Sequence, residues 1–205
     1  MASEQVGLPA TVPQARGLTE PGSPRPVGPP HAAGRFGPMP DAPDTLEFGA
    51  ADGIPNHPRW PLLLYRAAFP ADADAAIARF AEHGWRGAWV DGVFPYPHYH
   101  PNAHEVLAVV AGAATVRFGG SAGREVRVEA GDVAVLPAGT GHQRIDAEPD
   151  FQVVGAYPEG QEDFQTRRPD DGRPPAERAA MADVPRPTAD PVHGVGGPLF
   201  DLWPA

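Results

Sequence analysis

The stretch from Trp85 to Tyr157 consists of short apolar or alternating segments separated by Gly, Pro and Asp. Among them are "HEVLAVVAG", "REVRVEAG" and "VAVLP", joined by turn sequences such as "GGSAG" and "AGD". Many short strands at close, regular spacing are typical of a β-sandwich or barrel. The 28 Pro and 24 Gly also disfavour long helices, and 205 residues suit a single domain. We therefore predict a mainly β fold built as one domain.

Composition divides the chain into three parts. Residues 1–43 are rich in Pro, Gly and Ala and have few large apolar side chains, so we expect a disordered tail. Residues 44–160 form the predicted barrel domain, which includes one short helix in "PADADAAIARFAEHGW" that Asp72 or Asp74 caps. Residues 161–205 are Pro-rich but contain "PLFDLW" near their end. We expect this arm to pack on the barrel or on a neighbouring subunit.

Several kinds of covalent catalysis are excluded by residue types that the chain lacks. It has no Cys, which excludes thiolate nucleophiles, disulfides, iron–sulfur clusters and thiolate metal sites. Every basic residue is Arg, so no Lys is present to form a Schiff base. The serines lie in low-complexity or turn-like sequence, which disfavours a Ser-His-Asp hydrolase.

The charge and the hydropathy of the chain restrict its partners and its location. A formal net charge of -10 repels phosphate backbones and anionic lipids, so we expect no nucleic acid and no membrane as partner. The N-terminus lacks the basic and apolar blocks of a signal peptide, and no apolar run approaches the roughly 18 residues of a membrane span. We expect a cytoplasmic protein that binds a small molecule.

The stretch "PHYHPNAHEVLAVVAG" crowds metal-ligand residue types at the start of an apolar strand. His98 and His100 point to the same side of an extended chain. Glu105 follows the turn-forming "PN", where a bend can bring its carboxylate to the same centre. A fourth ligand is available in "GDVAVLPAGTGHQR", in which His142 begins a strand after a tight connection. Imidazoles and a carboxylate in this pattern favour a divalent transition metal.

The spacing of these residues resembles the two sequence motifs of the cupins. Residues 92–112 follow the first motif as G-x5-HYH-x4-E-x6-G, and residues 131–142 follow the second as G-x5-PAG-x2-H. The last position of the second motif, usually Asn, is here Asp146, which is not a ligand position. The wider chain, including "GIPNHPRWPLLLYR" and "FQVVGAYPEGQ", is similar to the YjlB-like cupins, a group without a firmly assigned reaction.

The cupin resemblance implies a double-stranded β-helix barrel and a homodimer. It also implies one divalent metal ion per chain, held by four candidate ligands: His98, His100, Glu105 and His142. Three neutral imidazoles and one carboxylate suit Fe(II), Mn(II), Ni(II), Co(II), Cu(II) or Zn(II). Such a set leaves one or two coordination positions open for chemistry.

Because side chains alternate between the two faces of a strand, further residues are candidates for contact with a ligand beside the ion. Arg144 shares a face with the fourth candidate ligand, where it could hold a substrate carboxylate, although a salt bridge at the barrel rim is an equal alternative. Tyr96 and Trp89 could stack on a ligand or cover it, but aromatic residues beside a barrel are more often core. Arg144 and Tyr96 are therefore our candidate catalytic residues. His104 precedes Glu105 and faces away from the ligand side, which favours a supporting or surface role.

These observations lead us to expect a metal-dependent enzyme that acts on a small polar molecule bearing a carboxylate. An Fe(II) oxygenase-type reaction is the first hypothesis. A redox-neutral isomerase or lyase that uses Zn(II), Mn(II) or Ni(II) is the second. The third is a non-catalytic cupin that captures a small metabolite without changing a bond.

Overall fold

The computed structural model of the chain describes residues 42–171 and 175–205, which belong to the unit formed by residues 36–205. The predicted disordered tail, residues 1–43, lies outside the described residues except at its last two positions. None of the described helices has the length and apolar character needed to span a bilayer. The elements are β1 (Asp44–Leu46), β2 (Leu62–Tyr65), α1 (Ala73–Glu82), β3 (Trp85–Asp91), β4 (Glu105–Ala111), β5 (Ala113–Phe118), β6 (Arg124–Glu129), β7 (Val133–Leu136), β8 (His142–Ala147), β9 (Gln152–Pro158), α2 (Pro175–Ala182) and α3 (Leu199–Leu202).

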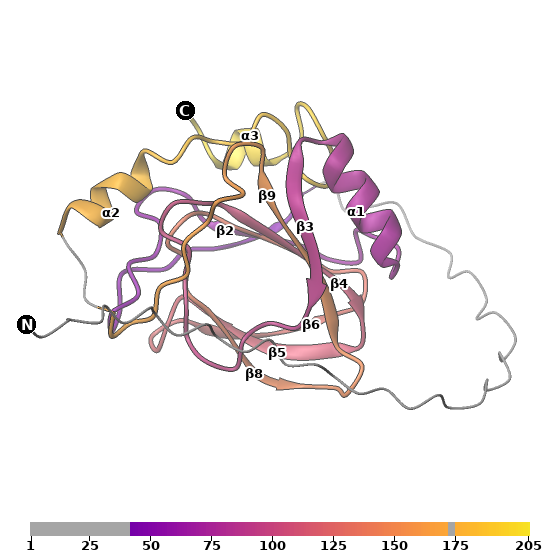
Figure 1. The fold of residues 1–205 in the computed structure, drawn as a ribbon, viewed down its shortest axis with the longest axis horizontal. Helices are drawn as coiled ribbons and strands as arrows, with labels where there is room; N and C mark the ends of the chain where they lie inside the picture. The colour runs from indigo at the N-terminus through magenta and orange to yellow at the C-terminus, as the bar shows by residue number, and fades with distance from the viewer. Residues whose placement is uncertain (1–41, 172–174) are drawn as a thin grey trace, which may run out of the picture. The chain divides into compact units, whose positions relative to one another are not determined.

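The strands form two antiparallel sheets that face each other (Figure 1). In the described part of the chain the larger sheet has the order β1-β2-β7-β4-β9-β3, and the smaller sheet has the order β6-β5-β8. The predicted mainly β class is confirmed, and α1 is the helix expected from the sequence. Two further short helices, α2 and α3, lie in the C-terminal part, where the high Pro content had hidden any helical pattern.

The central strands of the larger sheet are buried on both faces. On β4, Val106 and Ala108 belong to the core cluster that also contains residues of α1, whereas Leu107 and Val109 face the smaller sheet. This double burial explains why "EVLAVV" is a continuous apolar run. Strand β6 alternates between exposed and buried residues because only one of its faces is covered.

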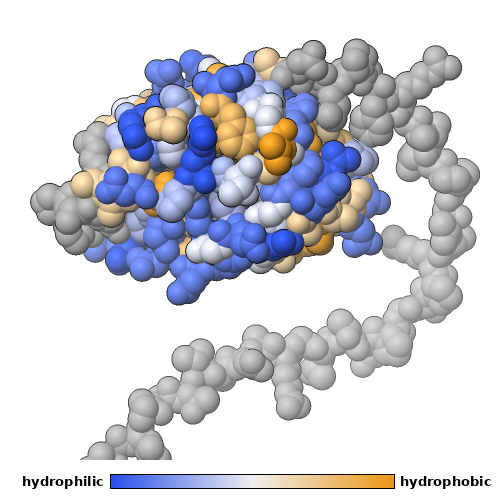
Figure 2. Space-filling view, turned by 90° about the horizontal axis from the view of Figure 1, so that it is seen from above, coloured by the Kyte–Doolittle hydropathy of each residue, from blue (hydrophilic) through white to orange (hydrophobic). Residues whose placement is uncertain are grey.

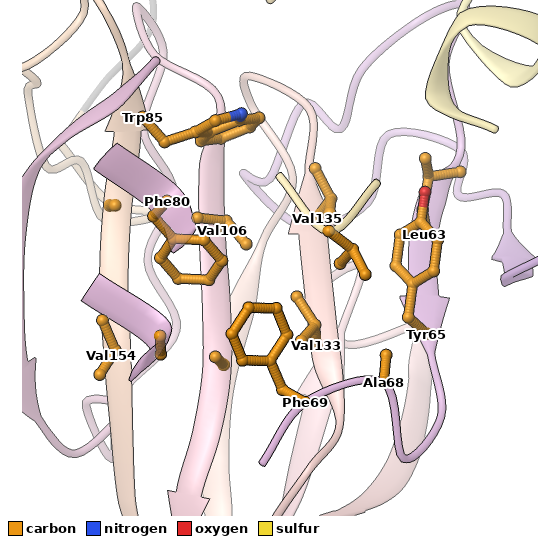
Figure 3. Close-up of a cluster of buried hydrophobic side chains, with 14 of the residues drawn as sticks. Leu63, Tyr65, Ala68, Phe69, Phe80, Trp85, Val106, Val133, Val135 and Val154 are labelled. Atoms are coloured by element: carbon orange, nitrogen blue, oxygen red, sulfur yellow. The ribbon is translucent and has the colours of Figure 1, made fainter. Parts of the chain in front are cut away.

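Helix α1 covers the outer face of the larger sheet. Asp72 caps it by accepting a hydrogen bond from the amide of Ala75 (2.8 Å), which settles the choice between the two candidate caps. Phe80 is fully buried, and its ring lies 5.7 Å from that of Phe69. Figure 3 shows both rings lying over the strands of the sheet. The apolar face of α1 thus completes a core layer outside the barrel.

The end of the chain packs on the same outer layer. Leu199 and Trp203 are both 0% exposed. The indole of Trp203 stacks on that of Trp60, with 5.3 Å between centroids and an interplanar angle of 2°. Its Nε1 donates to the carbonyl of Pro61 (2.8 Å), and Nε1 of Trp60 donates to the carbonyl of Pro204 (3.1 Å). These reciprocal contacts attach the terminal residues to the segment before β2.

Two buried histidines lie within this aromatic group. The ring of His104 is 5.1 Å from Trp203 and 5.5 Å from Trp60, and the ring of His57 stacks on Trp60 at 4.6 Å. Burial, together with the neighbouring His57, lowers the pKa of His104 to about 3. Burial, together with Arg59, lowers the pKa of His57 to about 4. Both rings are therefore neutral at neutral pH.

We expect the free energy of unfolding to decrease as the pH falls below about 6.5. The unfolded chain binds protons on His57 and His104 near that pH, whereas the folded chain does so only near their lowered pKa values. Each histidine should contribute about 1 kcal/mol per pH unit between its two pKa values. Urea unfolding at a series of pH values measures this slope. The double variant His57→Gln, His104→Gln should show a shallower slope, and an equal slope in both proteins would contradict the prediction.

The surface drawn in Figure 2 is mostly hydrophilic, with hydrophobic residues gathered near the middle of that face. Among the described residues, the large hydrophobic side chains that remain exposed are Val90, Phe94, Ile145 and Val195. Val90 and Phe94 both border a cavity that the four candidate ligands also line. Exposed apolar side chains are thus found at the edge of a candidate site.

Candidate metal centre

His98 and His142 lie opposite each other because their backbones are paired. The amide of His98 donates to the carbonyl of His142 (3.2 Å), and the amide of His142 donates to the carbonyl of His98 (2.9 Å). Their ring centroids are therefore only 3.9 Å apart. The amide of Gly139 donates to the carbonyl of His100 (2.7 Å), which joins the same two segments a second time. The two predicted motifs thus meet at one place.

Three imidazoles form a buried cluster that could hold a metal ion. One ring nitrogen from each of His98, His100 and His142 lies within 4.8 Å of the other two. All three residues are buried. We call these residues the three-histidine cluster; it contains three of the four candidate ligands.

The backbone fixes the protonation of each ring in the three-histidine cluster. Nδ1 of His98 lies 3.1 Å from the carbonyl of Tyr96, Nδ1 of His100 lies 2.9 Å from that of Gln165, and Nδ1 of His142 lies 3.2 Å from that of Thr140. A carbonyl oxygen only accepts, so Nδ1 carries the proton in each neutral ring. The lone pair on Nε2 is then available to a metal, as in sites where backbone carbonyls orient ligating histidines.

Glu105, the first residue of β4, brings a carboxylate against this cluster. Its Oε1 lies 3.5 Å from Nε2 of His100, and its Oε2 lies 3.3 Å from Nε2 of His142. Lone pairs on neutral rings and on a carboxylate repel each other at these distances unless a proton or a cation neutralises them. Among the described residues, Oε2 of Glu105 has no hydrogen-bond partner. The buried donor set therefore fits a divalent metal ion.

The electrostatics favour the ligand forms of His98 and Glu105, whereas the carboxylate of Glu105 favours the protonated form of His100. Burial, reinforced by the nearby His142, lowers the pKa of His98 to about 2, so this ring is neutral. Burial alone would raise the pKa of Glu105, but His100 and His142 outweigh it and hold that pKa well below its usual range. Burial would likewise lower the pKa of His100, but Glu105 outweighs it and raises that pKa. The carboxylate is therefore anionic at neutral pH.

Tyr157 and Trp89 hold the carboxylate in place. The hydroxyl of Tyr157 lies 3.0 Å from Oε1 of Glu105, to which it donates, and it accepts a hydrogen bond from Nε1 of Trp89 (3.0 Å). The indole of Trp89 fits because its partner on β9 is Gly155, where a Cβ would lie 2.2 Å from the indole ring. Burial, with the negative Glu105 beside it, raises the pKa of Tyr157, so the phenol keeps its proton.

Replacing Tyr157 with Phe should weaken the binding of a divalent metal by about tenfold, because Glu105 loses the donor that orients it. Titration of the protein with Co(II) against a competing chelator measures the affinity. Tyr65→Phe is the matched control, since it removes a buried hydroxyl bound to a carboxylate, that of Asp190, outside the centre. Tyr65→Phe should lower stability without changing the Co(II) affinity. Equal Co(II) affinities for the Tyr157→Phe variant and the unmodified protein would contradict the role of Tyr157.

A cavity of about 300 Å³ opens beside the centre. Its walls come from β3, β4 and β9 of the larger sheet, from the start of β8 in the smaller sheet and from the segments that follow β3 and β9. It is lined by Trp89, Val90, Asp91, Gly92, Val93, Phe94, His98, His100, Glu105, Leu107, His142, Tyr157, Phe164 and Thr166. A small molecule in this space would touch all four candidate ligands.

The two candidate catalytic residues, Arg144 and Tyr96, are not among the described residues that line this cavity. Arg144 opposes Val116 on β5, its amide donates to the carbonyl of Phe94 (2.9 Å), and its side chain is not part of the cavity lining. Tyr96 also lies outside the lining; its ring stacks on Phe94 at 4.9 Å, and its carbonyl orients His98. Arg144 lies on the same face of β8 as His142, as alternation along a strand predicts. However, two residues along a strand span about 7 Å, which places the side chain of Arg144 away from the cavity.

Two further predictions concern residues beside the centre. His104 does face away from the candidate ligands, but it lies in the aromatic group of the outer core and is 0% exposed, so it is not a surface residue. Trp89 lines the cavity, which is the position required for contact with a ligand. Sequence reasoning missed Tyr157, although alternation from Gly155 along β9 would have placed it on the inner face. Phe164 gave no such signal because it follows β9 in irregular structure.

Comparison with known proteins agrees with this geometry. Residues 89–149 match the cupin domain family. The chain is 40% identical over 158 residues to the uncharacterized protein YjlB of Bacillus subtilis, which covers 76% of this chain and 94% of YjlB.

The solved structures to which the chain is similar include two bacterial enzymes. The acireductone dioxygenase of Bacillus anthracis, with cadmium in its active centre, is 18% identical with a TM-score of 0.33, over 47% of this chain and 76% of that chain. A mutant of the Bacillus subtilis oxalate decarboxylase OxdC is 16% identical with a TM-score of 0.35, over 54% of this chain and 28% of that chain. This chain thus spans less than a third of the decarboxylase, and both activities belong to those proteins. From its two motifs, its antiparallel barrel and its similarity to YjlB, the chain belongs to the cupins, in the family of YjlB.

Proposed function

We propose that this cupin is a metal-dependent enzyme that acts on a small molecule, most simply by an Fe(II) oxygenase-type reaction. The observation that supports it is the buried three-histidine cluster beside a cavity, in which Nε2 of His100 and Nε2 of His142 lie within 3.5 Å of the carboxylate of Glu105. A divalent ion held by these residues would supply a Lewis acid, and a redox-active one would supply electrons to oxygen.

The residues of the chain have definable tasks in such a reaction. The backbone carbonyls at Nδ1 orient the three imidazoles, and Tyr157 orients Glu105. Leu107 and Phe164 supply apolar walls that exclude water from the reacting molecule. The substrate is thereby positioned next to the donor set in a preformed site.

The choice of an oxygenase over an isomerase or lyase rests on the shortage of acid–base groups in the cavity. A redox-neutral isomerisation needs a positioned side chain that exchanges protons near neutral pH. Apart from the candidate ligands, the titratable side chains of the described lining are Tyr157 and Asp91. Burial raises the pKa of Tyr157 away from neutrality, and Asp91 is exposed at the end of β3. Neither is suited to repeated proton transfer at the centre.

Elemental analysis of protein purified anaerobically without added metal tests the proposal. We expect about one iron per chain, and we expect nitric oxide, a probe of open positions on Fe(II), to give the electron paramagnetic resonance signal of an iron–nitrosyl centre. Stoichiometric zinc or manganese with no such signal would overturn the oxygenase in favour of an isomerase or lyase. A stable protein that neither contains nor takes up a metal would overturn the enzyme altogether.

A further inference from the structure

The cavity beside the metal centre is mostly apolar. Six apolar side chains supply its walls: Trp89, Val90, Val93, Phe94, Leu107 and Phe164. Besides the candidate ligands, the polar side chains of the described lining are those of Tyr157, Asp91 and Thr166. Tyr157 is already engaged by Glu105 and Trp89. Little of this wall could form hydrogen bonds with the body of a polar ligand.

Two phenylalanines pack against the three-histidine cluster, each against a different histidine. Phe94 meets the ring of His98 edge-on, with 5.0 Å between centroids and an interplanar angle of 70°. Phe164 meets the ring of His100 edge-on at 4.9 Å and 79°. Phe164 also stacks on Tyr157, with 4.1 Å between centroids. A molecule bound to an ion held by the cluster would therefore lie next to aromatic rings, which favour flat, apolar partners.

The charge of the lining limits the charge of the ligand. None of the described residues that line the cavity is an arginine, and the chain has no lysine. A divalent ion beside the anionic Glu105 leaves a single positive charge, which one anionic oxygen neutralises. A second carboxylate on the ligand would face the apolar wall or Asp91 without a cation, and burying an unpaired charge is costly.

We propose that the cavity takes a compact aromatic or similarly flat apolar molecule whose head chelates the metal through two oxygens that together carry one negative charge. The volume of about 300 Å³ lies at the small end of ligand sites, which suits a single ring. This inference rests on the metal centre of the proposed function and replaces the expectation of a polar metabolite anchored by Arg144.

Ligand binding to the Co(II)-loaded protein tests the substrate class without requiring turnover. The probes are tropolone, an aromatic chelator with one negative charge, and oxalate, a chelating dianion with no apolar body. The visible absorption of bound Co(II) reports each titration. We expect Phe94→Ala and Phe164→Ala each to weaken tropolone binding by about tenfold and to change oxalate binding by less than about twofold. Phe200→Ala, which truncates a half-buried ring on α3, is the matched control and should change neither.

The outcomes separate this inference from the proposed function. If Co(II) does not bind to the protein, the metal centre itself is wrong. If Co(II) binds but both Phe variants retain the tropolone affinity of the unmodified protein, or lose oxalate affinity to the same extent, the aromatic substrate class is wrong while the metal centre stands. The Co(II) content of each variant is measured first, because Phe94 and Phe164 touch candidate ligands.

Discussion

Replacing His142 with Ala should lower the affinity of the protein for Co(II) by more than about 100-fold, because even residues that only orient a ligand are worth about 10- to 100-fold. The substitution removes Nε2, which lies 3.3 Å from Oε2 of Glu105. It leaves the backbone pairing with His98 in place, since both of those hydrogen bonds involve main-chain atoms. The loss of affinity therefore reports on the imidazole and not on the local fold.

A chelator competition followed by elemental analysis of the dialysed protein measures this effect. His83→Ala is the matched control, because it removes an imidazole whose Nδ1 likewise contacts a backbone carbonyl, that of Pro191 (2.8 Å), outside the metal centre. We expect the control to bind Co(II) as the unmodified protein does. Stoichiometric Co(II) in the dialysed His142→Ala protein would show that the two motifs do not act together at one ion.

The convergence of the candidate ligands was predictable because it depends on local geometry. Alternation along an extended chain places His98 and His100 on one side. The tight connection before β8 then places His142 at the start of a strand, where the backbone pairs with His98. Short spacings and turn residues carry this information, so the sequence alone predicts that these side chains converge.

The shape of the cavity was not predictable in the same way. Alternation along β8 placed Arg144 on the same face as His142, but the two-residue offset moves its side chain about 7 Å along the strand, out of the cavity lining. Phe164 reaches the centre from a segment without regular structure, so no periodicity marks it. The charge and the apolarity of a pocket depend on such loop side chains. For this reason the sequence suggested an arginine that anchors a carboxylate, whereas the structure has aromatic side chains in the cavity wall.

Replacing Trp203 with Ala should lower the free energy of unfolding by about 3–5 kcal/mol, the usual cost of truncating a buried Trp. Trp203 is 0% exposed, and its removal leaves Trp60 without its stacking partner. It also leaves the carbonyl of Pro61 without the indole donor. Urea unfolding monitored by far-UV circular dichroism measures the change.

Two further variants distinguish the effect of lost packing from the effect of any substitution in the C-terminal segment. Trp203→Phe keeps a ring but not the donor to Pro61, so it should cost less than Trp203→Ala. Val195→Ala lies in the same C-terminal segment but is 89% exposed, and it should change stability by less than about 0.5 kcal/mol. The metal centre lies on the other side of the larger sheet, so folded Trp203→Ala protein should bind Co(II) as before. A Trp203→Ala protein as stable as the Val195→Ala control would mean that the terminal residues do not contribute to the outer core layer.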